Sequence, residues 1–126
     1  MSDSGQGRVW SRWFEIPASN FERAIAFYEQ ILSIKIQPVD LGTVKMGFFP
    51  HHEFGASICW GEHYQPGANG IVIYLDASPD LLTIQDKIEA AGGQILQSKK
   101  HISDNHGYMA LFLDSEGNRL ALHSMA

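Results

Sequence analysis

Apolar residues recur at helical spacing in the segment that covers residues 21–32. The positions that share one face are Phe21, Ala24, Ile25, Tyr28, Ile31 and Leu32. Steps of three and four residues are typical of a helix with one buried face. The run Ser19-Asn-Phe-Glu22 in front of it matches a capping box, in which two side chains bond the free amides of the first turn. We therefore expect a helix whose N-cap is Ser19.

A second helical stripe consists of Leu81, Ile84, Ile88 and Ala91. Ser78-Pro79 predicts its start, because proline already has the φ of the first helical position. Asp80 would then complement the positive end of the helix dipole. Gly92-Gly93 can adopt the left-handed conformation that ends many helices. The sequence thus predicts a second helix from about residue 79 to residue 91.

Strand-like segments, in which apolar and polar residues alternate, occupy the rest of the chain. The clearest are residues 13–16, 71–75 and 119–123, and further candidates are 34–39, 43–49, 56–60, 94–98 and 108–113. The run Asp114-Ser-Glu-Gly-Asn118 predicts a hairpin turn, with Gly117 or Asn118 at positive φ. The order strand, helix, three strands occurs twice. We therefore predict an α+β fold of two βαβββ modules.

The length of 126 residues fits one domain. We place this domain at residues 9–126, with module one at about 9–61 and module two at about 70–124. The polar, glycine-containing residues 1–8 are expected to form a disordered N-terminal tail. Glycine, proline and asparagine between residues 61 and 70 indicate a linker between the modules.

Period-two alternation also assigns the two faces of each strand. Phe14 and Ile16 share one face of the first strand, and Leu120 and Leu122 share one face of the last. The opposite faces are mixed in character, and they carry Trp13, Glu15, Ser57, Cys59, Tyr74 and His123. Aromatic walls with a few polar groups are typical of ligand sites, so these six residues are the candidate binding residues. The alternative is a sheet face that meets only water.

The net charge restricts the expected binding partners, and the cysteine content restricts the expected location. The net charge is −5, and no cluster of basic residues exceeds Lys99-Lys100. This excludes nucleic acid and acidic membranes as expected partners. One cysteine cannot form an intramolecular disulfide, which favours a reducing, cytoplasmic location. No apolar run approaches the ~20 residues that span a bilayer.

Three segments resemble the glyoxalase/bleomycin resistance protein/dioxygenase family, the vicinal oxygen chelate superfamily. The first is Trp13-Phe-Glu-Ile-Pro-Ala-Ser-Asn-Phe-Glu-Arg-Ala-Ile-Ala-Phe-Tyr28, the second is Ile88-Glu-Ala-Ala-Gly-Gly-Gln-Ile95 and the third is Phe112-Leu-Asp-Ser-Glu-Gly-Asn-Arg-Leu-Ala-Leu122. The third segment has Ser115 where the family usually has proline. The resemblance implies that the two modules form a cupped, eight-stranded mixed sheet around a cleft, often in a homodimer.

The resemblance does not extend to the metal ligands of the family. Aligning the motifs places Trp13, Gly70 and Ala121 at three of the four usual ligand positions. The fourth position falls within residues 54–61, which contain no histidine or carboxylate. A catalytic divalent ion generally needs three protein ligands. We therefore predict no bound metal and no other cofactor.

Glu15 and His123 lie two residues from expected ligand positions, on the same faces, and are the candidate catalytic residues. They could bind a metal together with Cys59, act as a carboxylate–imidazole base, contact a ligand, or form a structural ion pair. The leading hypothesis is a domain that binds a small organic molecule as a homodimer. One alternative is a glyoxalase-type lyase or dioxygenase with a site rearranged around Glu15 and His123. Another is an interaction module with a vestigial cleft.

Overall fold

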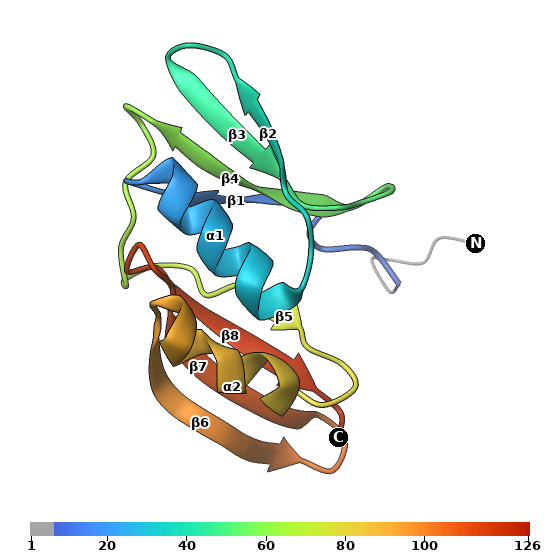
Figure 1. The fold of residues 1–126 in the computed structure, drawn as a ribbon. Helices are drawn as coiled ribbons and strands as arrows, with labels where there is room; N and C mark the ends of the chain where they lie inside the picture. The colour runs from blue at the N-terminus through green and yellow to red at the C-terminus, as the bar shows by residue number, and fades with distance from the viewer. Residues whose placement is uncertain (1–6) are drawn as a thin grey trace, which may run out of the picture.

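The computed structural model describes residues 7–126, which form eight strands and two helices (Figure 1). Module one contains β1 (Trp13–Pro17), α1 (Phe21–Leu32), β2 (Gln37–Asp40), β3 (Val44–Phe48) and β4 (Gly55–Gly61). Module two contains β5 (Tyr74–Asp76), α2 (Leu82–Ala91), β6 (Gln94–Ser103), β7 (Gly107–Leu113) and β8 (Arg119–Ser124). Residues 1–6, most of the predicted disordered tail at 1–8, lie outside the described residues.

The strands form two four-stranded mixed sheets. Sheet A has the order β1-β4-β3-β2 and sheet B has the order β5-β8-β7-β6. Strand β1 pairs in parallel with β4, and β5 pairs in parallel with β8. The other neighbouring strands are antiparallel. The prediction of two βαβββ modules is thus confirmed. Strands β1 and β5 are edge strands of their sheets.

The two helices lie next to each other, and their buried sides belong to one apolar core (Figure 1). Phe27, Tyr28 and Ile31 of α1 are fully buried, as is Ile88 of α2. Phe27 of α1 packs near Phe112 of β7, with ring centroids 6.3 Å apart. The core therefore runs continuously from one module into the other.

The predicted apolar faces of the strands are the ones that pack into this core. Ile16, Ile58, Leu120 and Leu122 belong to it and are at most 3% exposed. Alternation along each strand then puts the mixed face on the side away from the core. We call these two mixed surfaces the open face of sheet A and the open face of sheet B.

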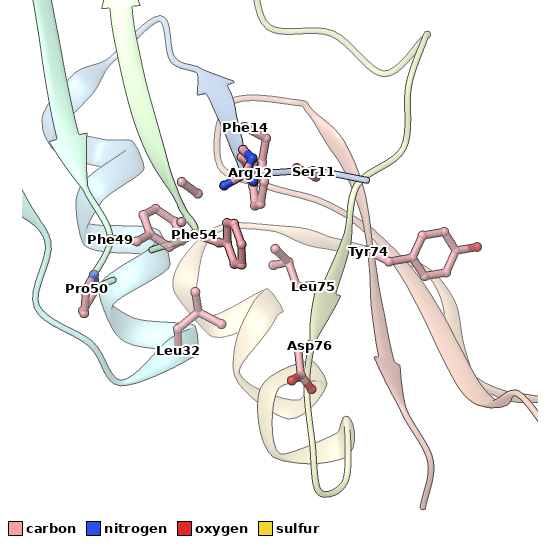
Figure 2. A pocket seen from close by; sticks show the side chains of 12 residues that line it. Ser11, Arg12, Phe14, Leu32, Phe49, Pro50, Phe54, Tyr74, Leu75 and Asp76 are labelled. Carbon is pink, nitrogen blue, oxygen red and sulfur yellow. The ribbon is translucent and has the colours of Figure 1, made fainter. Parts of the chain in front are cut away.

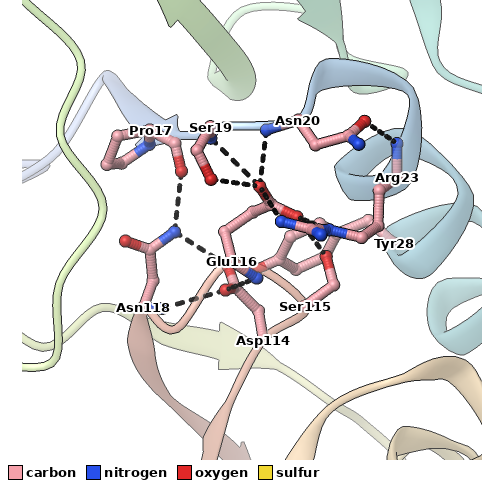
Figure 3. Close-up of polar contacts among 9 residues, drawn as sticks. All are labelled: Pro17, Ser19, Asn20, Arg23, Tyr28, Asp114, Ser115, Glu116 and Asn118. Atoms are coloured by element: carbon pink, nitrogen blue, oxygen red, sulfur yellow. Dashed lines mark hydrogen bonds and ion pairs between the residues drawn. The ribbon is translucent and has the colours of Figure 1, made fainter.

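The turn at residues 114–118 of module two forms hydrogen bonds with the start of α1 in module one (Figure 3). The carboxylate of Glu116 accepts hydrogen bonds from the amides of Ser19 and Asn20 and from the guanidinium of Arg23. Asn118 donates to the carbonyl of Pro17 at 2.8 Å. These contacts join segments about a hundred residues apart in sequence and hold the modules together.

This turn also explains why the predicted N-cap of α1 is wrong. The N-cap is Asn20, whose side chain accepts from the amide of Arg23 at 3.0 Å. Ser19 instead donates its hydroxyl and its amide to Glu116. Both residue types are good caps. The contact with module two therefore decides which of them caps the helix.

The second helix begins later than predicted, at Leu82, with no side-chain cap. The amide of Ser78 bonds the Asp76 carboxylate, and the amide of Leu81 bonds Ser124. The segment before α2 is thus held by neighbours outside the helix. The predicted end is confirmed, because Gly92 has a φ of 108° and caps the last turn.

Strand β5 is shorter than predicted, because only Tyr74–Asp76 pairs with β8. Ile71 lies outside the strand and is 90% exposed. The predicted turn after β7 is confirmed, with Gly117 at a φ of 88°. Within residues 7–126, neither helix is long and apolar enough to cross a membrane.

Candidate functional site

Four of the predicted site residues meet on the open face of sheet A. β1 pairs with β4 so that Glu15 lies beside Ser57. The indole Nε1 of Trp13 donates to the Ser57 hydroxyl at 3.2 Å, and that hydroxyl lies 3.3 Å from the Cys59 sulfur. The imidazole of His51 packs edge-on against the Trp13 ring, with centroids 4.8 Å apart. The Trp13 ring thus lies next to the buried Ser57 hydroxyl and Cys59 sulfur.

Glu15 is held in place by a residue of the linker. The Tyr64 hydroxyl lies 3.1 Å from both carboxylate oxygens of Glu15 and donates to them. Burial of the phenol and the neighbouring Cys59 and Glu15 raise the pKa of Tyr64 to about 12. Tyr64 therefore stays protonated at neutral pH and keeps donating to Glu15. The arrangement presents an oriented carboxylate at an exposed position.

Cys59 has the properties of a structural thiol. Its exposed fraction is 0%, and burial raises its pKa, an effect that the hydrogen bond from Ser57 only partly offsets. A nucleophilic cysteine needs an accessible thiolate in an electropositive setting. Cys59 has a carboxylate, Glu15, in its surroundings instead. It is therefore unsuited to act as a nucleophile.

The other two predicted residues lie on the open face of sheet B. Tyr74 is 54% exposed at the start of β5. His123 lies beside Asp76 across the β5–β8 pair, and its Nε2 is 2.6 Å from the carbonyl oxygen of His106. Hydrogen bonds from Ser78, together with the nearby His123, lower the pKa of Asp76. This half of the site offers an aromatic ring and an imidazole next to a carboxylate.

A pocket of about 570 Å³ lies between the edge strands β1 and β5 (Figure 2). Its apolar walls are Phe14, Leu32, Phe49, Phe54 and Leu75. The Arg12 guanidinium lies 5.2 Å from the centre of the Phe54 ring. Tyr74 borders the pocket, but its ring points away from it (Figure 2).

A smaller pocket of about 200 Å³ lies where the other end of β1 approaches the linker and β8. We call it the seam pocket. Glu15 borders it from sheet A and Arg119 from sheet B. The Nε atom of Arg119 is buried and has no hydrogen-bond partner among the described residues. Glu15 thus belongs both to the open face of sheet A and to this pocket.

The structure brings together Trp13, Glu15, Ser57 and Cys59 in one cluster and places Tyr74 and His123 on the other sheet. Within residues 7–126, no hydrogen bond or ion pair joins the two sets. A common cleft that both sets line therefore stays a prediction.

Two residues of this region, Tyr64 and Arg119, were not predicted from the sequence. Arg119 carries a signal that could have found it, because it alternates with Leu120 and so belongs to the same mixed face as His123. Tyr64 carries no such signal, because it lies in a linker without periodicity.

The residues present do not fit the usual metal site of the resembled family. Trp13, Gly70 and Ala121 have no side-chain oxygen or imidazole nitrogen to offer. Among residues 7–126, no three histidine, cysteine or acidic side chains lie close enough to hold a metal ion. Glu15 and His123, the displaced candidates, lie on different sheets.

Two βαβββ modules with two four-stranded mixed sheets define a glyoxalase-like α+β domain. The model of the Glyoxalase/Bleomycin resistance protein/Dioxygenase superfamily matches residues 11–122, and the chain belongs to this superfamily. The resemblance inferred from the sequence is thereby confirmed. No curated protein matches the chain significantly.

Several solved structures share the fold. The hypothetical protein SA1046 from S. aureus has a TM-score of 0.68 at 21% identity, over 98% of this chain and 99% of that one. A glyoxalase/bleomycin resistance protein from Albidiferax ferrireducens T118 has a TM-score of 0.67 at 17% identity, over 90% and 97%. The fosfomycin resistance protein FosX from Listeria monocytogenes has a TM-score of 0.68 at 16% identity, over 88% and 87%. At these identities the likeness concerns the fold alone.

Proposed function

We propose that this protein binds a small organic molecule on the open faces of its sheets, without a catalytic metal ion. Trp13 and Tyr74 would supply aromatic walls for the ligand, and Glu15 and His123, which lie on different sheets, would each bond a separate polar group of it. The proposal also places the protein in the cytoplasm, where a reducing environment suits the free thiol of Cys59.

The observation that carries this proposal is the orientation of Glu15 by Tyr64. An exposed glutamate normally samples many rotamers, and fixing one costs conformational entropy. Here a linker tyrosine bonds both of its oxygens at 3.1 Å, so that cost is met in the folded protein. Preorganised polar groups next to an aromatic surface are typical of ligand sites.

The lyase or dioxygenase alternative needs Glu15 and His123 to act on the same atom. Within the described residues they lie on different sheets and share no contact. Glu15 is bonded to Tyr64 and His123 to the carbonyl of His106. No observation therefore favours the rearranged catalytic site over ligand binding.

We further propose that the protein is a homodimer. Strands β1 and β5 each leave one edge of their sheet without a strand partner among residues 7–126. Free strand edges tend to be covered by another chain. Trp10 is 84% exposed close to the start of β1 and adds apolar surface there. Sedimentation equilibrium at tens of micromolar should give twice the mass of the chain, and a monomer would contradict this proposal.

A thermal-shift screen with small aromatic acids and amines would test the binding function. A compound that raises the melting temperature of the wild type should fail to do so for Trp13→Phe with Glu15→Gln, which keeps an aromatic ring and the size of the glutamate but removes the indole and the charge. Trp10→Phe is the matched control, because Trp10 lies outside the open faces. If the double variant responds like the wild type, the ligand does not bind on the open face of sheet A.

A further inference from the structure

The seam pocket contains an arginine that the fold does not use. The side chain of Arg119 makes no hydrogen bond or ion pair with the residues described in the structure, and its Nε atom is buried. A buried donor without a partner is costly, so native structures rarely leave one unsatisfied. Protein atoms shield the Nε atom, so an anionic group in the pocket would bond the terminal nitrogens of the Arg119 guanidinium.

We propose that the seam pocket binds the carboxylate of a small hydroxy or amino acid through Arg119. This proposal rests on the proposed binding function, because Glu15 belongs to both sites. The planar guanidinium presents parallel N–H groups that match the two oxygens of a carboxylate. The volume of about 200 Å³ is smaller than that of pockets for drug-sized ligands, so the ligand is small.

Glu15 sets the second requirement on the ligand. Glu15 lines the same pocket, and its carboxylate is oriented by the Tyr64 hydroxyl. A dianion such as phosphate would be repelled by this negative charge. A carboxylate with a neighbouring hydroxyl or ammonium group would bond Arg119 with its oxygens and donate to Glu15 with the other group. The pocket therefore selects for the pair of groups rather than for negative charge alone.

The remaining walls fit such a ligand. Ile73 and Leu120 supply an apolar floor for a short carbon chain. The amide of Asn118 is already engaged, since it donates to Pro17 and Asp114 and accepts from Gly67. Asn118 therefore holds Pro17 and Gly67 of the pocket wall in place. Arg119 and Glu15 are left to make the polar contacts with the ligand.

NMR titration of the full chain with lactate tests the proposal directly. The Nε–H resonance of Arg119 should shift and saturate with lactate, whereas lactamide, which lacks the charge, and inorganic phosphate should leave it in place. Arg119→Met should weaken lactate binding at least tenfold, followed through the backbone amides of Ile73 and Leu120. Arg8→Met is the control, because Arg8 is exposed and outside the pocket.

Acetate has the carboxylate of lactate but lacks its hydroxyl, so comparing the two ligands separates the contributions of these groups to binding. Glu15→Gln should weaken lactate binding several-fold and leave acetate binding unchanged. The proposal is overturned if lactate gives no saturable shift at Arg119, if phosphate or lactamide shifts it equally, or if Arg8→Met weakens binding as much as Arg119→Met. Since lactate does not need Trp13, the Trp13→Phe variant should bind it normally even if the proposed aromatic site fails.

Discussion

The Tyr28 hydroxyl in α1 donates a buried hydrogen bond of 2.6 Å to the carboxylate of Asp114 at the end of β7. The two residues are 86 positions apart and belong to different modules. Burial, followed by the Asp114 charge and the hydrogen bond to it, raises the pKa of Tyr28 well above its usual value. The phenol is therefore a donor throughout the physiological pH range.

Replacing Tyr28 with phenylalanine should lower the free energy of unfolding by about 1–3 kcal/mol, because a buried carboxylate oxygen loses one donor. Urea denaturation followed by circular dichroism measures this change. Tyr74→Phe is the matched control, since that ring is 54% exposed and should change stability by less than about 0.5 kcal/mol. Equal effects of the two substitutions would contradict the role given to the Tyr28 bond.

Glu116 makes the contact between the modules sensitive to acid. Its partial burial would raise the pKa, but hydrogen bonds from Arg23, the Asn20 amide, Ser115 and Ser19 outweigh burial and lower the pKa to about 2. The usual value is 4.5, so the folded state holds the charged form more tightly than the unfolded state does. The resulting stabilisation is complete above pH 4.5 and is lost as the pH falls towards 2.

The difference between these pKa values corresponds to at most about 3 kcal/mol, and solvent screening reduces it because Arg23 is half exposed. Glu116→Gln should therefore destabilise the protein at pH 7 and flatten its loss of stability between pH 4.5 and 2. Urea denaturation at several pH values measures both effects. Glu53→Gln, in an exposed loop, should leave the pH profile unchanged. An unchanged profile in Glu116→Gln would show that Glu116 does not cause the acid sensitivity.

The two faces of β8 should respond differently to truncation. Leu122 is fully buried, so Leu122→Ala should cost about 2–5 kcal/mol of unfolding free energy. His123 points to the open face and bonds only the His106 carbonyl, so His123→Ala should cost about 1 kcal/mol or less. Thermal denaturation of both variants makes the comparison. A larger effect for His123→Ala would reverse the assignment of the faces.

Cys59 should resist thiol reagents in the native protein. The sulfur is fully buried, and the raised pKa keeps it protonated at pH 7 to 8. With a chromogenic disulfide reagent, we expect slow labelling that follows global unfolding, and fast labelling in concentrated urea. Rapid stoichiometric labelling of the native protein would mean that the open face of sheet A admits reagents to Cys59.

The sequence was sufficient for the modules and the strand faces, because both depend on local periodicity. Period-two alternation placed Ile16 and Leu122 in the core correctly. It failed where a distant partner decides the outcome. Ser19 lost its capping role to a contact with Glu116, and strand pairing of β5 with β8 begins only at Tyr74, preceded by a single backbone bond from Ala121 to the Ile73 carbonyl.

The candidate site was only partly predictable for the same reason. Trp13, Glu15, Ser57 and Cys59 lie on two strands that pair directly, so alternation could group them. Tyr64 reaches Glu15 across 49 residues from a linker without periodicity. The seam pocket depends on how the modules pack against each other, which the pattern within each strand does not encode.

The contacts between the turn at 114–118 and the start of α1 make the linker mechanically dispensable. Two separate polypeptides, residues 7–61 and 70–126, retain the Tyr28–Asp114 and Arg23–Glu116 bonds and the shared core. Omitting residues 62–69 removes the hydrogen bonds of Tyr64 to Glu15 and of Gly67 to Asn118, together with the high local concentration that a tether provides, which is in the millimolar range for short linkers. The two halves should therefore complement each other when mixed, with an affinity that falls when Glu116 is replaced.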